Sequence, residues 1–528
     1  MDFALLIFGG GLLFWFGVAY WRNAVFGALL LVVFEGAIRK WVLPQSSMTV
    51  YFAKDFLLLG AYTGYFFGDR RKRSSGLSER RRRSNGFGEG INMLLLCAVI
   101  WTFFESFNFD TGSILSGLFG WKAYVMYIPL CFMVPSLFRS EHELAKFLRY
   151  YLANALPVAL LGVAQFSAGP DSPLNVYASG ADSGAGDSGN IAVFGDDTYV
   201  RITGTFSYIS GYGSYLIVIL ALLLPLLALS RSIRWRITFV ATLVLVIANA
   251  AMTGSRSVAL GAGLVLAGYI ALSMATNARR KRSHIWVNVL AVGAALVAMS
   301  LFFEPAVTAL QQRAQAGFES GENQNRLRAA ISEPLDFFED AGLFGHGNGI
   351  AQPAVAALRK AIHLPPAIYA FASPTDSENS RVLMELGIPG FLLWFGMRVA
   401  LIVALWRTRS RLRSPFLHAL ALGACLVLFY QLFTATTFSP TANVYHWFLA
   451  GFILLLPRLE LHPVPGVVAN QPQLVRNRWF SRRRSTLKDA AASSSSSQQI
   501  TSDAAQTKSR LNPPNERRGS RKYRKSSS

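Results

Sequence analysis

The chain has 528 residues, of which 52% are hydrophobic, 15% are charged and 13% are aromatic, and its formal net charge is +22. A soluble protein of this size carries roughly a quarter charged residues, and a nucleic-acid-binding protein carries its Lys and Arg on a soluble domain. Here long apolar runs alternate with short basic clusters, which is typical of a protein that crosses a membrane many times. The composition therefore excludes a soluble enzyme and a secreted disulfide-rich domain, and nucleic acid is not an expected partner.

About thirteen apolar segments have the length near 20 residues that a membrane-spanning helix needs. We therefore expect an all-α fold, a multi-pass transmembrane helical bundle of about 12–13 spans. The expected spans lie at residues 2–20, 23–41, 50–68, 91–108, 120–138, 147–167, 208–230, 236–253, 257–276, 285–303, 382–406, 415–436 and 441–457.

The loops between these segments differ in charge from one side to the other. On one side lie the basic clusters of residues 70–83, 231–236, 279–282 and 407–413, together with the basic C-terminal residues after 476. On the other side, residues 168–200 hold five Asp and no Lys or Arg, and residues 304–380 are also acidic. Because basic loops stay in the cytoplasm, we predict a cytoplasmic C-terminus and acidic loops outside.

This distribution divides the chain into three parts. Residues 1–170 are expected to be N-terminal transmembrane helices, and residues 171–464 a transmembrane core that includes the external loop 304–380. Residues 465–528 are rich in Ser, Arg, Asn, Gln and Pro, so we expect a disordered basic cytoplasmic tail. The tail is predicted either to attract anionic membrane lipids or to be solvated without a specific partner.

The loop 304–380 is too long for a passive connection. Helical patterns are expected at 305–318, 325–340 and 352–362, and the second has Leu327, Ile331, Leu335 and Phe338 on one face. A partly helical external loop between two spans is a candidate lid or substrate platform.

Four motifs lie on the predicted external side, and each contains glycine beside polar residues. They are Arg201–Tyr215, Thr253–Gly261, Gly342–Gly349 and Asp376–Gly390. In this order they resemble the O-antigen ligase and O-antigen polymerase superfamily of bacterial inner-membrane glycosyltransferases. The resemblance is carried by Arg201 with Gly204-Thr-Phe, by Ser255-Arg256-Ser257, by the long loop, and by Glu385-x-Gly387-x-x-Gly390, and it covers roughly residues 200–400.

The resemblance implies transfer of a glycan from an undecaprenyl-diphosphate carrier to a sugar hydroxyl of a lipid-linked glycan or a lipid A-core acceptor. Arg suits a diphosphate because its planar fork pairs with phosphate oxygens. Arg201 and Arg256 lie at external span ends, against the usual charge bias, so we predict that they bind the lipid diphosphate rather than snorkel. Arg381, Arg326 and Arg328 are further candidates, although the last two fit surface pairs with Glu322 or Glu333 equally well.

The acceptor hydroxyl needs a catalytic base. The candidates are His346, which lies in a glycine-rich turn, and Asp376 and Glu378, which occupy the region where ligases of this family commonly carry a His-Asn pair. No His stands there in this chain, which favours a polymerase over a ligase. Glu385 is expected to orient an Arg such as Arg381. No cofactor and no metal are expected.

Charged residues inside the other expected spans are Glu35, Lys54, Asp55, Glu105 and Lys122. Such groups are costly in a membrane and mark either a site or a structural ion network. Lys54 and Asp55 are adjacent, so they point to different helix faces and should not pair simply with each other. A transporter or lipid flippase would also fit many spans with internal charges, and a non-catalytic scaffold acting through the basic tail is a third alternative.

Overall fold

The N-terminal part of the chain is built from helices and short helical turns. The structure of the whole chain is a computed structural model, which describes residues 2–68, 87–178, 191–194, 198–230, 232–276, 283–322, 324, 328, 332–368 and 377–461. The N-terminal elements are α1 (Asp2–Ala19), α2 (Trp21–Ala37), η1 (Ile38–Val42), η2 (Pro44–Ser46), α3 (Ser47–Phe66), α5 (Glu89–Glu105), η4 (Phe109–Thr111), α6 (Ile114–Val125), α7 (Ile128–Leu137), α8 (Glu141–Ala153) and α9 (Ala155–Ser167).

The remaining elements form the core helices, the long loop and the C-terminal helices. A two-residue antiparallel pair, β1 (Val193–Phe194) with β2 (Tyr199–Val200), precedes the core. The core and loop helices are α10 (Ile209–Leu229), α11 (Ile233–Met252), α12 (Arg256–Thr276), α13 (Ser283–Phe302), α14 (Glu304–Glu319), α16 (Glu333–Asp336), α17 (Phe338–Ala341) and α18 (Pro353–Ala361). The C-terminal elements are α19 (Glu378–Arg411), α20 (Pro415–Tyr430), η5 (Gln431–Phe433), α21 (Pro440–Ala450) and α22 (Phe452–Leu461).

The expected all-α membrane fold is confirmed. Within the described part of the chain, nine helical segments are long and apolar enough to cross a membrane. Each of the thirteen expected spans overlaps one helix or two consecutive helices, but the four at 2–20, 23–41, 50–68 and 91–108 are not among the nine. Two of those four, α2 and α5, have 17 residues each, and α3 carries charged residues in its interior.

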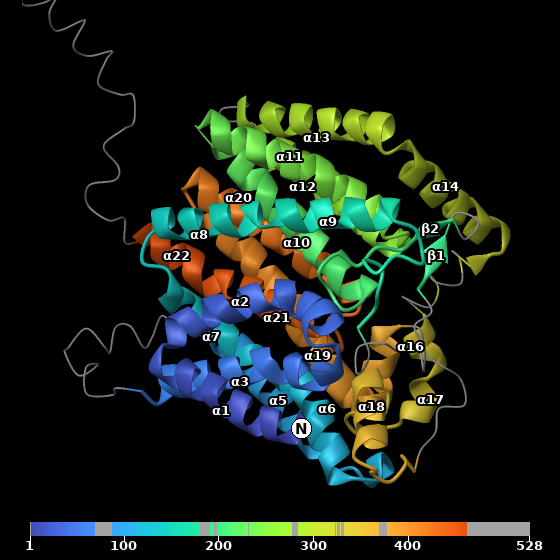
Figure 1. The fold of residues 1–528 in the computed structure, drawn as a ribbon. Helices are drawn as coiled ribbons and strands as arrows, with labels where there is room; N and C mark the ends of the chain where they lie inside the picture. The colour runs from blue at the N-terminus through green and yellow to red at the C-terminus, as the bar shows by residue number, and fades with distance from the viewer. Residues whose placement is uncertain are drawn as a thin grey trace, which may run out of the picture. The chain divides into compact units, whose positions relative to one another are not determined.

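The helix α10 occupies the centre of the bundle, where α11, α12, α20 and α21 pack around it (Figure 1). Its sequence is apolar on every face, so it can be buried all round. Helices at the periphery instead expose large apolar side chains, for example Leu260 at 74%, Leu290 at 70% and Phe302 at 77%. Exposed apolar faces of this kind suit contact with lipid rather than water.

Three helices are expected in the long loop, and the structure describes four there. The helices α14 and α18 coincide with the expected helices at 305–318 and 352–362. The segment 325–340 is described only in part, and within it α16 and the start of α17 form separate short helices beside α19 (Figure 1). Leu335 and Phe338 are exposed there, so this part of the predicted apolar stripe is not buried. The predicted tail 465–528 lies outside the described residues.

Candidate functional site

The first two sequence motifs meet at the start of α10 and α12. The Nε atom of Arg201 donates to the carbonyl oxygen of Thr253 over 3.0 Å. Gly254 has a φ of 59°, which residues with a side chain rarely adopt, and a Cβ atom there would come within 3.1 Å of Arg201 Cγ. We call Arg201 together with Thr253–Arg256 the arginine turn. Its glycine therefore permits close packing of the two segments that carry the predicted phosphate-binding arginines.

The second arginine of this turn contacts the long loop. Arg256 is the first residue of α12, and its Nη2 atom lies 2.5 Å from Oε1 of Glu322. The Tyr177 hydroxyl donates to the carbonyl oxygen of Arg201 over 3.1 Å. Burial raises the pKa of Tyr177 to about 12, so the hydroxyl stays protonated at neutral pH. The arginine turn is therefore a half-buried cationic site that the loop 304–380 reaches by an ion pair.

A basic turn after α2 packs against the same segment. Lys40 Nζ donates to Thr203 Oγ1 over 3.0 Å and to the carbonyl oxygen of Gly204 over 2.7 Å. Arg39 Nη1 donates to Ser207 Oγ over 2.9 Å. The N-terminal helices therefore fix the backbone that follows Arg201, and two more cations lie beside the first motif.

The fourth motif breaks the helix α19. Gly387 has φ of 65° and ψ of −177°, which lies outside the helical region. Pro389 follows and has no N–H to donate to the carbonyl oxygen of Glu385. The kink therefore frees backbone carbonyl groups inside the protein, and these need other donors.

The third motif supplies those donors. We call Gly342–Gly349 the glycine loop. His346 N donates to the carbonyl oxygen of Met384 over 2.8 Å, and Gly347 N donates to that of Glu385 over 3.0 Å. The glycine loop and the kink of α19 therefore complete each other's hydrogen bonds, which explains why both segments are rich in glycine.

The Glu385 carboxylate accepts four hydrogen bonds beside this kink. Its Oε1 accepts from the backbone N–H groups of Gly349 at 2.9 Å and Ala351 at 3.0 Å. Its Oε2 accepts from the Tyr124 hydroxyl at 2.7 Å and from Gln352 Nε2 at 3.1 Å. Glu385 is fully buried, so it acts as a fixed anchor between α6, the loop and α19.

The expectation that Glu385 orients Arg381 is wrong, because its four donors come from other residues. Arg381 is half-buried in the first turns of α19, and Arg328 is exposed between α14 and α16. The remaining predicted residues Arg326 and Asp376 lie outside the described residues.

His346 lies between two oxygen acceptors. Its Nδ1 is 2.7 Å from Oδ2 of Asp110, and its Nε2 is 3.0 Å from the carbonyl oxygen of Asp340. His346 therefore joins η4 to the glycine loop, and both of its ring nitrogens are engaged within the protein.

Glu378 is also engaged within the protein. Its Oε1 lies 3.3 Å from Arg398 Nη1, and its Oε2 accepts from the backbone N–H groups of Thr436 at 2.5 Å and Phe438 at 3.2 Å. Glu378 therefore holds the turn between η5 and α21 in place.

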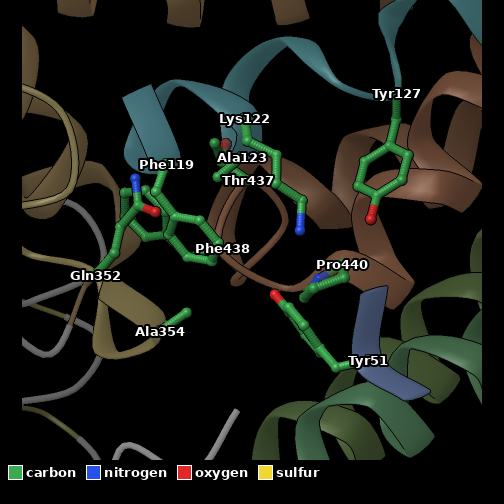
Figure 2. Close-up of a pocket in the computed structure, with 10 residues that line it drawn as sticks. All are labelled: Tyr51, Phe119, Lys122, Ala123, Tyr127, Gln352, Ala354, Thr437, Phe438 and Pro440. Atoms are coloured by element: carbon green, nitrogen blue, oxygen red, sulfur yellow. The ribbon is translucent and has the colours of Figure 1, made fainter. Parts of the chain in front are cut away.

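That turn forms one wall of a pocket, which we call the lysine pocket (Figure 2). The other walls come from α3, from α6 and from the start of α18. The lining residues are Tyr51, Phe119, Lys122, Ala123, Tyr127, Gln352, Ala354, Thr437, Phe438 and Pro440. Figure 2 shows the Lys122 ammonium group projecting into the space between Tyr51 and Tyr127.

Buried ion pairs lie behind the lysine pocket. Lys122 Nζ is 2.5 Å from Oδ2 of Asp55, whose Oδ1 accepts from the Tyr127 hydroxyl at 2.8 Å. Lys54 Nζ is 2.7 Å from Oε2 of Glu35. Lys54 and Asp55 thus have different partners, as their adjacent positions on α3 predict.

Several pocket residues were not identified from the sequence. Lys122 and Asp55 were noticed as charges inside expected spans, but Tyr51, Gln352 and Thr437 belong to none of the four motifs. They are common residue types at positions without a distinctive spacing. Gln352 marked the start of an expected loop helix, and nothing in the sequence linked that position to Glu385.

Comparison with known proteins supports the family resemblance. A family model described as O-antigen ligase matches residues 241–395, from within α11 to within α19. This segment contains Arg256, the glycine loop and Glu385. No curated protein matches the chain. The chain is therefore a multi-pass membrane protein whose residues 241–395 are similar to the O-antigen ligase family, which supports its resemblance to the O-antigen ligase and polymerase superfamily.

Proposed function

We propose that this protein is an inner-membrane glycosyltransferase of the O-antigen polymerase type. It transfers a glycan from an undecaprenyl-diphosphate carrier to a sugar hydroxyl of a lipid-linked acceptor. The acidic loops face away from the cytoplasm and the basic loops face the cytoplasm. The reaction therefore takes place on the external side of the inner membrane. The absence of a His near residue 376 in the sequence supports polymerisation over ligation.

The meeting of Arg201 with the Thr253–Arg256 turn carries this proposal. The reaction breaks the bond between the anomeric carbon of the donor sugar and the diphosphate oxygen, and the electron pair leaves with the diphosphate. The acceptor hydroxyl oxygen forms the new bond to that carbon and gives up its proton. The guanidinium groups of Arg201 and Arg256, whose segments meet at Thr253, stabilise the charge that develops on the leaving diphosphate. Arg381, Arg326 and Arg328 are secondary candidates for the same task.

The proton of the acceptor hydroxyl requires a base among His346, Asp376 and Glu378. The hydrogen bonds of His346 to two acceptors, and those of Glu378 to Arg398 and to the 436–438 turn, favour a structural role for both residues. We therefore assign the base to Asp376.

The test compares glycan products in a strain that lacks the chromosomal gene and carries variants of this chain. We expect Arg201→Ala and Arg256→Ala to reduce chain extension about 100-fold or more, which is typical for loss of a group that stabilises developing charge. The exposed cytoplasmic-side Arg411→Ala serves as the matched control and should give the parental pattern. Parental glycan profiles from both arginine-turn variants, at equal membrane levels, would refute the proposal.

The same strain separates the related activities. Without the protein, accumulation of single lipid-linked repeat units indicates a polymerase, whereas long unligated chains indicate a ligase. Asp376→Asn should abolish extension, and Asp336→Asn, which changes an exposed carboxylate of α16, should not. Accumulation of substrate inside proteoliposomes without any glycan product would favour a transporter instead.

A further inference from the structure

The ion pair between Arg256 and Glu322 places a carboxylate on a residue that is proposed to bind a diphosphate. Glu322 Oε1 lies 2.5 Å from Arg256 Nη2. A guanidinium group pairs with the oxygens of a carboxylate and of a phosphate through the same N–H donors. Glu322 therefore uses a part of Arg256 that an oxygen of the diphosphate would also use.

The two members of this ion pair are covered to different degrees. The Arg256 side chain is 13% exposed, whereas the Glu322 side chain is 43% exposed. An ion pair with a well-exposed member adds little stability, because water and dissolved ions replace that member at small cost. Arg256 is therefore the fixed member of the pair, and Glu322 is the member that can be exchanged.

The start of α12 favours negative charge and has no acidic residue of its own. The first turn of α12 contains neither Asp nor Glu, and the hydroxyl oxygens of Ser255 and Ser257 lie 3.0 Å apart on either side of Arg256 in the chain. The first N–H groups of a helix carry partial positive charge, which favours an anion nearby. Because Glu322 brings the negative charge from another segment, a ligand can take its place without a change in α12.

A glycine turn after α14 carries Glu322 to Arg256. The helix α14 packs beside α11, α13 and β1, which fixes its position. Gly321 follows the helix with φ of 72°, and its N–H donates to the carbonyl oxygen of Phe318 over 3.2 Å. A left-handed glycine of this kind ends a helix and turns the chain. Rotation about the bonds of Gly321 and Glu322 therefore moves the carboxylate while α14 stays in place.

The charge of the reaction product gives such an exchange a purpose. In the donor each phosphate of the diphosphate is esterified on one side, so each has one ionised oxygen. The released lipid diphosphate gains a further ionisable oxygen where the sugar was attached. Guanidinium groups that bind the donor therefore hold the product at least as strongly, because they pair better with the more negative group. A competing carboxylate on the same guanidinium assists release of the product.

We propose that Glu322 is an exchangeable anion for Arg256, which pairs with the guanidinium between turnovers, yields it to the donor diphosphate and returns to displace the diphosphate product. This inference rests on the proposed function, because it takes Arg256 as a ligand of the diphosphate. Glu322 then sets donor affinity and product release, and it takes no part in the making or breaking of bonds.

The first test measures binding of inorganic diphosphate to the full chain in lipid nanodiscs by isothermal titration calorimetry. Glu322→Gln keeps the size of the side chain and removes the competing charge, so diphosphate should bind about fivefold more tightly. Glu319→Gln is the matched control, because it removes the same charge from an exposed position at the end of α14. This control should stay within about twofold of the parental affinity.

A double-mutant cycle separates exchange at Arg256 from a general effect of charge. Arg256→Ala should weaken diphosphate binding. In that background Glu322→Gln should change the affinity by less than about twofold, because the pair is already broken. A gain from Glu322→Gln that persists without Arg256 would overturn the inference.

A transfer assay in the same nanodiscs tests product release, with lipid-linked glycan extracted from the deletion strain as donor. Glu322→Gln should lower both the KM for the donor and the kcat, because donor and product are both held more tightly. A lower kcat with an unchanged KM would indicate a defect in the chemical step and would overturn the inference.

The binding experiment also distinguishes this inference from the proposed function. Equal binding by the parental chain and Glu322→Gln, with a loss in Arg256→Ala, would overturn the exchange and leave the diphosphate site intact. Weaker binding by Glu322→Gln would also overturn it, because Glu322 would then orient Arg256 for the ligand. No diphosphate binding by the parental chain or by Glu322→Gln would contradict both the inference and the diphosphate role of Arg256.

Discussion

The arginine turn and the lysine pocket present their cations in different ways. In the arginine turn, Arg201 bonds to a backbone carbonyl group and Arg256 pairs with Glu322, which is 43% exposed. In the lysine pocket, Lys122 pairs with Asp55, which is almost completely covered. A charge paired at the surface can exchange its partner for a ligand, whereas a charge in a buried network is costly to disturb. We therefore expect changes at the arginine turn to affect activity, and changes around the lysine pocket to affect stability as well.

The arginine turn and the lysine pocket have no residue in common, and they are connected through neighbouring segments of the chain. Lys40 holds the segment after Arg201, and α3, which follows Lys40 in the chain, supplies Tyr51 and Asp55. On the other side, Glu385 fixes Gln352 of the pocket and lies in the fourth motif. The predictions below test whether changes in one region affect stability or activity independently of the other region.

The largest effect is expected at Glu385. Glu385→Ala removes the acceptor of four buried hydrogen bonds and leaves their donors unsatisfied, so the free energy of unfolding should fall by about 3 kcal/mol or more. Thermal unfolding of the detergent-solubilised protein measures this loss. Glu385→Gln, which keeps an acceptor oxygen, should lose less. An unchanged melting temperature for Glu385→Ala would show that the kink of α19 does not depend on this carboxylate.

The next effect concerns the buried pair of the lysine pocket. Lys122→Gln alone should destabilise the protein by about 3 kcal/mol because it leaves the Asp55 charge without its cation. The double variant Asp55→Asn/Lys122→Gln should be more stable than this single variant. The comparison is made from the melting temperatures of the single and double variants. Strictly additive losses would mean that the two groups do not act as a pair.

A smaller and more local effect is expected in the arginine turn. Gly254→Ala places a side chain where φ is 59° and within 3.1 Å of Arg201 Cγ, so it should cost about 1–2 kcal/mol and displace the arginine. Glycan extension should fall more than stability does. Gly263→Ala in α12, where a Cβ atom meets no atom within 4 Å, is the control and should behave as the parental chain. Equal loss of extension in both variants would contradict the close approach at Gly254.

The smallest effect is expected from the C-terminal tail. Deletion of residues 465–528 should leave extension and membrane level within about twofold, because both regions are built from residues that precede the tail. Glycan gels and quantitative membrane blots measure the two quantities. Loss of activity with a normal amount of protein in the membrane would favour the scaffold alternative, in which the protein acts through its basic tail.

The expected spans agree with the helices because hydropathy is a sum over neighbouring residues, and lipid contact requires little more than length and apolar composition. The same argument explains where the prediction was less complete. The helix α3 carries Lys54 and Asp55, and its apolar character is reduced, yet it forms because its charges find Glu35 and Lys122 on other helices. A pairing of that kind is not visible in a local window.

The sequence predicted which segments belong to the candidate site, but it did not predict which side chains in them contact one another. The glycines of the third and fourth motifs pointed to unusual backbone, and Gly387 does adopt a left-handed φ. The role of Glu385 was not foreseen, since its donors Tyr124 and Gln352 come from segments far from it in the chain. Spacing within a helix suggested Arg381 instead, because such patterns report only neighbours one turn away.

The sequence by itself determined the membrane class, the helix positions, the asymmetry of the loops and the family resemblance, since these depend on local composition and on ordered motifs. Only the tertiary structure decided which side chains meet. It joined Arg201 to the turn before Arg256, kinked α19 against the glycine loop, and brought Tyr51, Lys122 and Gln352 around one pocket. The physical reason is that buried polar and charged groups must find partners, and in a helical bundle most of those partners lie on other helices.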